Sequence, residues 1–223
     1  MDHDDILDTS KLCFDGNFDD QVQGILLRVR WSRLEVQDLR PLLKDVEEAL
    51  QQLAAGCRVT PFGSLVTGLG IKTSDIDCHV SLPPGMQPSK QCVIRARNIL
   101  KQNHRLFTNL FAITAAKVPI VKFTHVPTGC ECDVSFSGPT SIRNSELLGF
   151  LLGMDKRALD LCILIKYWSK VYVFTGTNYM PNYALTLLVI FYLQTRNILP
   201  PVKILQLDVE PWLVDNWNTA FND

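Results

Sequence analysis

Hydrophobic residues in the first 56 positions are spaced as they are in helices. They recur at intervals of three and four within residues 22–29 and again within residues 42–53, which is the period of an amphipathic α-helix. Each of these helices would present one apolar face that another element has to cover. The first part of the chain therefore predicts two helices that pack against a larger unit.

The hydrophobic period changes to two after residue 57, and this alternation is typical of strands. The predicted strands span residues 58–62, 75–82, 106–115, 119–126 and 130–136, and a helix is predicted over residues 89–103. Such a succession predicts a mixed sheet with a helix packed on it. After residue 142 the helical spacing returns, most clearly over residues 155–173 and 182–196.

The last of these helices, over residues 182–196, is apolar on nearly every side. Helices of this kind normally lie inside a core, so we expect this one in the centre of a helical domain. Trp168 belongs to the preceding helix, and we expect it to be buried in the same core.

The chain of 223 residues is 47% hydrophobic and 20% charged, with a mean hydropathy of +0.08. This composition supports a sizeable buried core and excludes disorder as the main state. No uncharged apolar stretch reaches the length of about 18 residues that a membrane span needs, so we expect no membrane segment. The first residues are acidic and lack an apolar run, which argues against a secretory or transit peptide at this terminus.

Charge is unevenly distributed along the chain. Residues 1–20 contain seven aspartates and one lysine, a net charge of −6, and the remaining residues carry a net charge of +5. We expect residues 1–17 to form a solvated acidic tail. A net charge of +5 is too small for broad adhesion to nucleic acid but is sufficient for a local phosphate site. The seven cysteines include no Cys-x-x-Cys pair and the four histidines show no zinc spacing, so we expect reduced thiols and a cytoplasmic protein.

Two aspartates flank one apolar residue at the start of the second predicted strand. The strand period of two would place Asp75 and Asp77 on one face and Ile76 on the other. Neighbouring carboxylates repel each other unless a cation lies between them, and Mg²⁺ is commonly held by a few carboxylates together with water and phosphate oxygens. An Asp-x-Asp pair alone is weak evidence, because Asp2 and Asp4 form another one.

A Gly-Ser pair lies between the first strand and a following helical stretch. Gly63 suits a tight turn, and the Ser64 hydroxyl together with free backbone N–H groups can hold phosphate oxygens. A third acid, Asp133, lies in the last predicted strand, which we expect to neighbour the strand of Asp75 and Asp77. Three carboxylates on adjacent strands predict a two-metal site, in which one ion activates an attacking hydroxyl and the other neutralises a triphosphate.

Five short segments of the chain are together highly specific for one family. They are Phe62-Gly-Ser64, Ser74-Asp-Ile-Asp77, Asp133-Val-Ser-Phe136, Lys166-Tyr-Trp-Ser-Lys170 and Asn182-Tyr-Ala-Leu-Thr-Leu187. With them the chain resembles, over nearly its whole length, the DNA-polymerase-β-like nucleotidyltransferases, and within these the terminal uridylyltransferases and the related cytoplasmic-type poly(A) polymerases. The resemblance is much less specific for the nucleotide that is transferred.

The resemblance implies an α+β fold in which a small mixed-sheet nucleotidyltransferase domain packs against a helical domain, with the active site in the cleft between them. We assign residues 57–140 to the catalytic domain and residues 18–56 and 141–223 to the helical domain, which is of the poly(A)-polymerase-associated type. The related enzymes continue well beyond the position of Asp223, so this helical domain would be incomplete at its C-terminal end.

The functional residues of the family carry over by position. Gly63 and Ser64 match the turn that grips the incoming triphosphate. Asp75, Asp77 and Asp133 match the ligands of Mg²⁺ or Mn²⁺. The last of these acids would lie nearest the RNA 3′ hydroxyl.

Further matches lie in the second half of the chain. Asn144 stands where related enzymes contact the ribose. Lys166 and Lys170 are four residues apart on one helix, so their ammonium groups point the same way, which matches the triphosphate contacts of the family. Tyr183 matches the residue that stacks on the base. Asn182 stands where many relatives carry a Ser that donates a hydrogen bond to a phosphate, and Asn is also a good helix N-cap.

The function implied is template-independent transfer of UMP from UTP to an RNA 3′ hydroxyl, with release of pyrophosphate. The same machinery could transfer AMP from ATP, as a poly(A) polymerase does. A 2′-5′ oligoadenylate synthetase of the same superfamily would need a larger surface for duplex RNA, which the near-neutral charge argues against. A non-catalytic RNA-binding scaffold would be recognised by the loss of one acid, but all three are present. The sequence does not indicate the RNAs, the protein partners or the oligomeric state.

Overall fold

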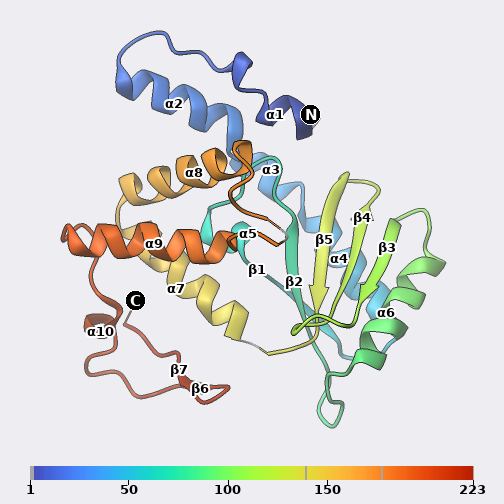
Figure 1. Cartoon of the computed structure of the whole chain (residues 1–223). Coiled ribbons are helices and arrows are strands. Elements are labelled where there is room, and N and C mark those ends of the chain that lie inside the picture. Colours follow the sequence, from blue (N-terminus) through green and yellow to red (C-terminus); the bar gives the residue numbers. More distant parts are fainter. Residues whose placement is uncertain (1–2, 139, 177, 223) are drawn as a thin grey trace.

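A five-stranded mixed sheet and two groups of helices form the computed structural model (Figure 1), which describes residues 3–138, 140–176 and 178–222. The strands are β1 (Arg58–Phe62), β2 (Ile76–Ser81), β3 (Phe107–Ile113), β4 (Ile120–His125) and β5 (Cys130–Ser135). They lie in the order β1-β2-β5-β4-β3, with β2 and β5 parallel and the other neighbours antiparallel. The α+β class is confirmed, and each strand of this sheet falls within its predicted span.

Helices precede, interrupt and follow the sheet. Before it come α1 (His3–Leu7), a 3₁₀ turn (Thr9–Lys11), α2 (Phe18–Val29), α3 (Arg33–Gln37) and α4 (Arg40–Leu50). Between strands lie α5 (Ser64–Thr67) and α6 (Lys90–Gln102). After the sheet come α7 (Thr140–Met154), α8 (Lys156–Val171), α9 (Asn182–Thr195), α10 (Val202–Leu205) and a short hairpin of β6 (Leu213–Val214) and β7 (Trp217–Asn218). Of the helices that the structure describes, none combines the length and apolarity needed to cross a membrane.

One face of the sheet is buried beneath α4 and α6 (Figure 1). Strand alternation directs Ile76 and Cys78 of β2 and Val134 of β5 to this face, and all three side chains are completely buried. The residues that alternate with them therefore point to the opposite face of the sheet, toward the helical half of the molecule.

The sequence analysis assigned residues 18–56 to the helical domain, and this assignment is wrong for α4. Leu42, Val46 and Leu50 lie along one side of this helix and are completely buried in the core beneath the sheet. Their spacing identified a helix but could not identify its partner surface. Thus α4 belongs to the sheet unit, whereas α2 packs with the C-terminal helices.

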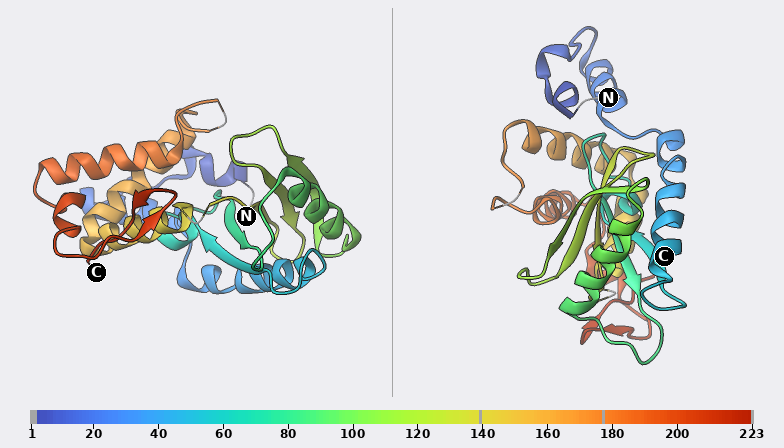
Figure 2. Two further views of the ribbon diagram at one scale, coloured as in Figure 1. Left: turned by 90° about the horizontal axis from the view of Figure 1, so that it is seen from below. Right: turned by 90° about the vertical axis from the view of Figure 1, so that its right-hand side faces the viewer.

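The helical half has its own core, which α2, α7, α8 and α9 form (Figure 2). The short helix α1 joins this core: Ile6 is completely buried, and the Tyr167 hydroxyl of α8 donates a hydrogen bond to the Ile6 carbonyl oxygen at 3.0 Å. Arg28 also pairs with Asp5 at 3.6 Å. The expectation that residues 1–17 form a solvated tail is therefore wrong for α1, because a buried apolar side chain and an ion pair dock it on the helices.

Two expectations about apolar residues of the last long helices are wrong. Trp168 of α8 is 46% exposed instead of buried. In α9, Ile190 and Leu193 face the core, whereas Leu188 and Phe191 are exposed. A helix that is apolar all round does not reveal which of its faces has a partner, and in the described structure α9 packs mainly against α8.

Backbone hydrogen bonds tie the segment after α2 to the loop that precedes β2. The Trp31 N–H donates to the Gly70 carbonyl oxygen at 3.2 Å, and the Lys72 N–H donates to the Val29 carbonyl oxygen at 2.8 Å. The Trp31 ring lies so close to Gly70 that a Cβ there would overlap ring atom Cε3. Glycine therefore permits this close approach, and the loop that it anchors leads directly to Asp75.

We predict that Gly70→Ala destabilises the fold by about 1–3 kcal/mol, because the added methyl group must push the Trp31 ring out of its place. The control is Gly24→Ala in α2, where nothing lies within 4 Å of an added Cβ. The control should stabilise the protein by about 0.5–1 kcal/mol, since alanine favours a helix over glycine. Urea unfolding of both variants checks the prediction, and equal stabilities would contradict it.

Candidate active site

Three charged side chains form a row across the middle of the sheet. Asp77 of β2 lies beside Asp133 of β5 in the parallel register, and Lys122 of β4 lies opposite Asp133 in the antiparallel register. Partners in register project to the same side of a sheet, and these three project away from α4 and α6. The expectation that the strand of Asp133 neighbours that of Asp77 is confirmed.

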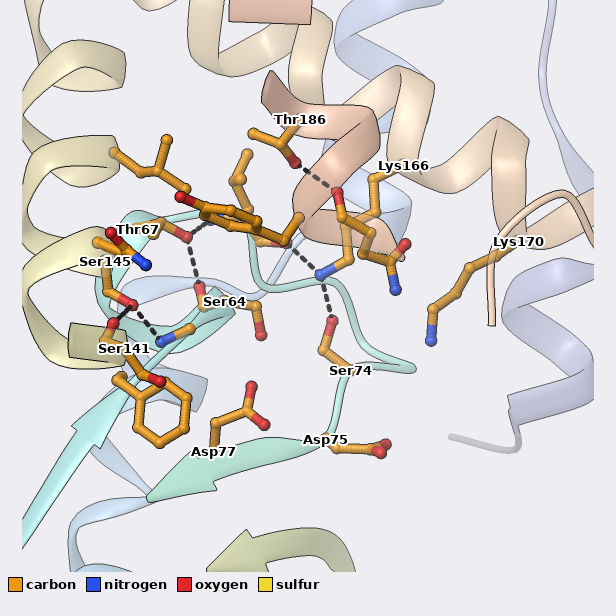
Figure 3. A pocket seen from close by; sticks show the side chains of 17 residues that line it. Ser64, Thr67, Ser74, Asp75, Asp77, Ser141, Ser145, Lys166, Lys170 and Thr186 are labelled. Carbon is orange, nitrogen blue, oxygen red and sulfur yellow. Dashed lines mark hydrogen bonds between the residues drawn. The ribbon is translucent and has the colours of Figure 1, made fainter. Parts of the chain in front are cut away.

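Asp75 lies just outside this row. The strand β2 begins at Ile76, so Asp75 precedes it rather than belonging to it. Figure 3 shows the Asp75 carboxylate turned away from Asp77, toward the side of the pocket on which Lys170 lies. The expectation that both acids belong to one strand is therefore corrected. The pairing of β2 with β1 ends at Asp77 and leaves Asp75 in the preceding loop.

Gly63 and Ser64 form the turn between β1 and α5. Gly63 has a φ of +66°, a conformation that glycine adopts easily, and a Cβ at this position would overlap the Asp77 carboxylate. The Gly63 N–H donates to the Ser145 hydroxyl of α7 at 2.8 Å, and that hydroxyl donates to the Ser141 carbonyl oxygen at 2.8 Å. These hydrogen bonds fix the turn beside the carboxylates and against the helical half, as Figure 3 shows.

Lys166 and Lys170 reach from α8 to the loop before β2. The Lys166 ammonium donates to the Leu69 carbonyl oxygen and to the Ser74 hydroxyl, both at 2.9 Å, and the residue is only 8% exposed. The Lys170 ammonium donates to the Thr73 carbonyl oxygen at 2.8 Å. Burial, and then the charge of Lys170, lowers the pKa of Lys166 to about 7, and burial also lowers the pKa of Lys170. Both ammonium groups point the same way, as their spacing predicts.

These side chains line a pocket of about 450 Å³ between the sheet and the helices (Figure 3). The lining includes most of the residues singled out in the sequence, namely Gly63, Ser64, Asp75, Asp77, Asn144, Lys166, Lys170, Asn182 and Tyr183. Asp133 is not part of the lining and lies next to Asp77 on the neighbouring strand. Asn182 does not cap α9, because Pro181 is the N-cap residue. The Asn182 Oδ1 atom is buried and accepts no hydrogen bond from the described residues.

The sequence pattern did not single out Lys122. Its Nζ atom lies 2.9 Å from a carboxylate oxygen of Asp75, 3.0 Å from one of Glu131 and 3.6 Å from one of Asp133. Burial alone would lower the pKa of Lys122, but the hydrogen bonds to Asp75 and Glu131 and the charge of Asp133 raise it above its ordinary value. One signal was present in the sequence, because Lys122 alternates with the apolar residues of β4 and therefore lies on the face of this strand that points away from the core.

The carboxylates lie close enough to disturb one another's ionisation. Burial, then the charge of Asp133 and that of Asp75, raises the pKa of Asp77 to about 7. Burial also raises the pKa of Asp133, whose buried Oδ1 atom accepts no hydrogen bond from the described residues. A divalent cation satisfies carboxylate oxygens in this state. The residues therefore fit a metal site in their chemistry.

The carboxylates of the described residues do not converge on a common position. Within the described residues, no three acidic, imidazole or thiol groups converge closely enough to hold a metal ion. Asp75 instead contacts the Lys122 ammonium group of β4, at 2.9 Å, and its carboxylate is turned away from Asp77 (Figure 3). The sheet thus presents the donor atoms of a metal site with a lysine ammonium among them.

The comparisons with known proteins agree with this geometry. The family model for the central palm domain of mitochondrial-like poly(A) RNA polymerase matches residues 18–152. Terminal uridylyltransferase 7 of Homo sapiens is 31% identical over 202 residues, which cover 85% of this chain and 13% of that protein. The chain therefore spans only a small part of the length of this relative.

Two solved structures share the fold of the chain. The structure of mtPAP in complex with GTP superposes with a TM-score of 0.86 at 23% identity, over 99% of this chain and 52% of the other. The structure of the Cid1 poly(U) polymerase with MgGTP bound superposes with a TM-score of 0.79 at 23% identity, over 92% of this chain and 65% of the other. Because the family match extends over more than half of its residues, the chain belongs to the RNA terminal nucleotidyltransferase family of the mitochondrial-like poly(A) RNA polymerases and the terminal uridylyltransferases.

Proposed function

We propose that the protein is an RNA terminal uridylyltransferase, which transfers UMP from UTP to the 3′ hydroxyl of an RNA and releases pyrophosphate. The observation that carries the proposal is the meeting of Asp75 and Asp77, a Gly-Ser turn and two lysines from a facing helix at one pocket, with Asp133 beside Asp77 on the neighbouring strand. Carboxylates suit metal-assisted nucleotidyl transfer, and the turn and the lysines suit a triphosphate. The likeness to terminal uridylyltransferase 7 supports UTP as the substrate.

Asp75, Asp77 and Asp133 are the residues that would hold Mg²⁺ or Mn²⁺. When bound, the ions would lower the pKa of the RNA 3′ hydroxyl and neutralise the triphosphate and its leaving group. In the proposed reaction Asp133 lies nearest that hydroxyl and accepts its proton. The Cid1 poly(U) polymerase, which shares the fold, binds GTP together with magnesium, and this supports magnesium as the accompanying ion.

The residues of the pocket bind and orient the two substrates. The RNA 3′ oxygen forms a bond to the α-phosphorus of UTP, and the bond from that phosphorus to the pyrophosphate group breaks. Ser64, Lys166 and Lys170 contact the triphosphate, so that the two ammonium groups act where the leaving group gains negative charge. Asn144 contacts the ribose, and Tyr183 stacks on the base.

Transfer of AMP from ATP is the second candidate function, and the match to the mitochondrial-like poly(A) RNA polymerase family favours it. The residues that we assign to nucleotide binding contact the phosphates and the sugar and stack on the plane of the base. Discrimination between uracil and adenine requires donors and acceptors placed against the base edge. The assigned residues alone therefore do not decide between the two nucleotides.

We predict that Asp77→Asn and Asp133→Asn each abolish magnesium-dependent extension of a labelled RNA, because each removes a charge that the metal ions require. Both variants should remain folded, since the amide has nearly the shape of the carboxylate. The matched control is Asp208→Asn, at an exposed position outside the pocket, and it should extend RNA at the wild-type rate. Near-normal turnover of Asp133→Asn would exclude the two-metal mechanism.

Asp77→Asn should also change how the stability of the metal-free protein depends on pH. The pKa of Asp77 rises from its ordinary value of 3.8 to about 7 on folding, so the folded protein keeps a proton that the unfolded chain releases. Stability therefore falls as the pH rises through this window. In EDTA the variant should have a higher melting temperature than the wild type at pH 8, by about 2–4 °C for each kcal/mol of added stability. This difference in melting temperature should shrink toward pH 5. A gap that does not vary with pH would refute this explanation.

Lys166→Met should raise the KM for UTP and lower kcat, because its ammonium group contacts the triphosphate before and during the reaction. Lys170→Met should act in the same direction with a smaller effect. Methionine keeps the alkyl chain, so the packing of α8 is preserved. A charged hydrogen bond contributes about 1.5–3 kcal/mol, which corresponds to a loss of about tenfold or more in kcat/KM. The control is Lys203→Met, at an exposed position of α10. Wild-type kinetics in both test variants would exclude a role in triphosphate binding and leave the lysines the role of fixing the loop before β2.

UTP should be incorporated in preference to ATP, CTP and GTP when the four nucleotides are compared in one extension assay. Tyr183→Ala should weaken the use of all four nucleotides to a similar degree, because stacking uses the ring face and does not read the base edge. Tyr183→Phe keeps the ring and should behave like the wild type. A clear preference for ATP would assign the protein to the poly(A) polymerases instead.

A further inference from the structure

A lysine ammonium group lies among the carboxylates that are proposed to hold the metal ions. Lys122 contacts Asp75, Glu131 and Asp133 at once, at 2.9, 3.0 and 3.6 Å. Two of these acids are proposed metal ligands, and Glu131 is not. In the metal-free protein a side chain of the protein itself therefore neutralises part of the charge that a metal ion would otherwise neutralise.

The strand register explains how Lys122 reaches two acids of β5. It lies directly opposite Asp133, and Glu131 is two residues earlier, so that both acids project from the same face of β5. The side chain of Lys122 is 31% exposed and that of Glu131 is 48% exposed. Because the ammonium group already lies 3.0 Å from Glu131 and 3.6 Å from Asp133, it can leave Asp133 for Glu131 by a small movement of the side chain, without a shift of the sheet backbone.

A divalent cation and the ammonium group compete for the same oxygen atoms. Both carry positive charge, so they repel each other if they share Asp75 and Asp133. For Asp75 to join Asp77 around a metal ion, it has to give up its contact with Lys122. Glu131 is the partner that then remains for the lysine, because it already lies 3.0 Å from Nζ.

We propose that Lys122 is a positioning residue that substitutes for the cation in the metal-free protein, and that metal binding displaces its ammonium group onto Glu131. The inference rests on the proposed function, because the same carboxylates hold the metal. Lys122 thereby stabilises the empty site and weakens metal binding. Glu131 strengthens metal binding, because it keeps the displaced ammonium group away from the metal ligands.

The first experiment is a titration of the metal-free protein with Mn²⁺, in which the free ion is followed by electron paramagnetic resonance. Lys122→Met removes the ammonium group, keeps the alkyl chain and should bind Mn²⁺ about tenfold more tightly than the wild type. Glu131→Gln should bind it several-fold more weakly. The control is Lys44→Met, which removes an exposed lysine that pairs with Glu48 on α4, and it should bind Mn²⁺ as the wild type does.

The second readout is the melting temperature of each variant in EDTA and in Mn²⁺. Lys122→Met should melt below the wild type in EDTA, because three carboxylates lose their counter-charge, and Mn²⁺ should raise its melting temperature by a larger amount. Lys122→Gln, which is uncharged but polar, should give the same pattern and serves if the methionine variant does not fold.

The outcomes separate the inference from the proposed function. If Asp77→Asn abolishes Mn²⁺ binding but neither Lys122 variant tightens it, the displacement of Lys122 is refuted and the proposed metal site stands. If Mn²⁺ binds neither the wild type nor the Lys122 variants, the proposed metal site fails and the inference fails with it. The same holds if Mn²⁺ binds Asp77→Asn as tightly as the wild type. Tighter binding by both Lys122 variants together with weaker binding by Glu131→Gln supports the displacement.

Discussion

The register between two parallel strands places Asp77 and Asp133 side by side in the middle of the sheet. The ladder hydrogen bonds fix the spacing of the two backbones, so the strands cannot separate to relieve the repulsion between the carboxylates. Positive charge has to reach them instead. Lys122 supplies it from the neighbouring strand, and the charge of Lys166 reaches Asp77 from α8. The packing of the helical half against the sheet is what brings the second of these cations into place.

The loop between α5 and β2 connects the sheet, the helices and the segment after α2. The Gly70 carbonyl oxygen of this loop accepts a hydrogen bond from the Trp31 N–H. Lys166 and Lys170 donate hydrogen bonds to carbonyl and hydroxyl oxygens of the same loop. Among the described residues, the buried Lys166 ammonium group donates hydrogen bonds to two neutral acceptors, and burial lowers its pKa although the charges of Asp77 and Asp75 act in the opposite direction. A triphosphate in the pocket would supply the negative charge that this lysine lacks. The same contacts therefore hold the loop and place two ammonium groups at the pocket.

The pocket has a buried carboxyl group on the sheet side and a buried ammonium group on the side of α8, and burial destabilises the charged form of each. Asp77 is destabilised as an anion by burial and by its acidic neighbours, and Lys166 is destabilised as a cation by burial and by Lys170. Opposed arrangements of this kind are typical of sites that bind charged ligands. In the proposed function, metal ions relieve the destabilisation of Asp77 and the triphosphate relieves that of Lys166.

The sequence by itself determined the strands of the sheet and the Gly-Ser turn, and it marked Asp75, Asp77 and Asp133 as candidates, because alternation, glycine chemistry and residue spacing are local properties. It did not reveal that Asp75 precedes its strand, that α4 packs on the sheet, or that Trp168 is exposed. Those facts depend on where strand pairing ends and on which surfaces meet. Lys122 was missed for the same reason. Its place beside Asp133 follows from the strand order β1-β2-β5-β4-β3, and only the tertiary structure decides which strands become neighbours.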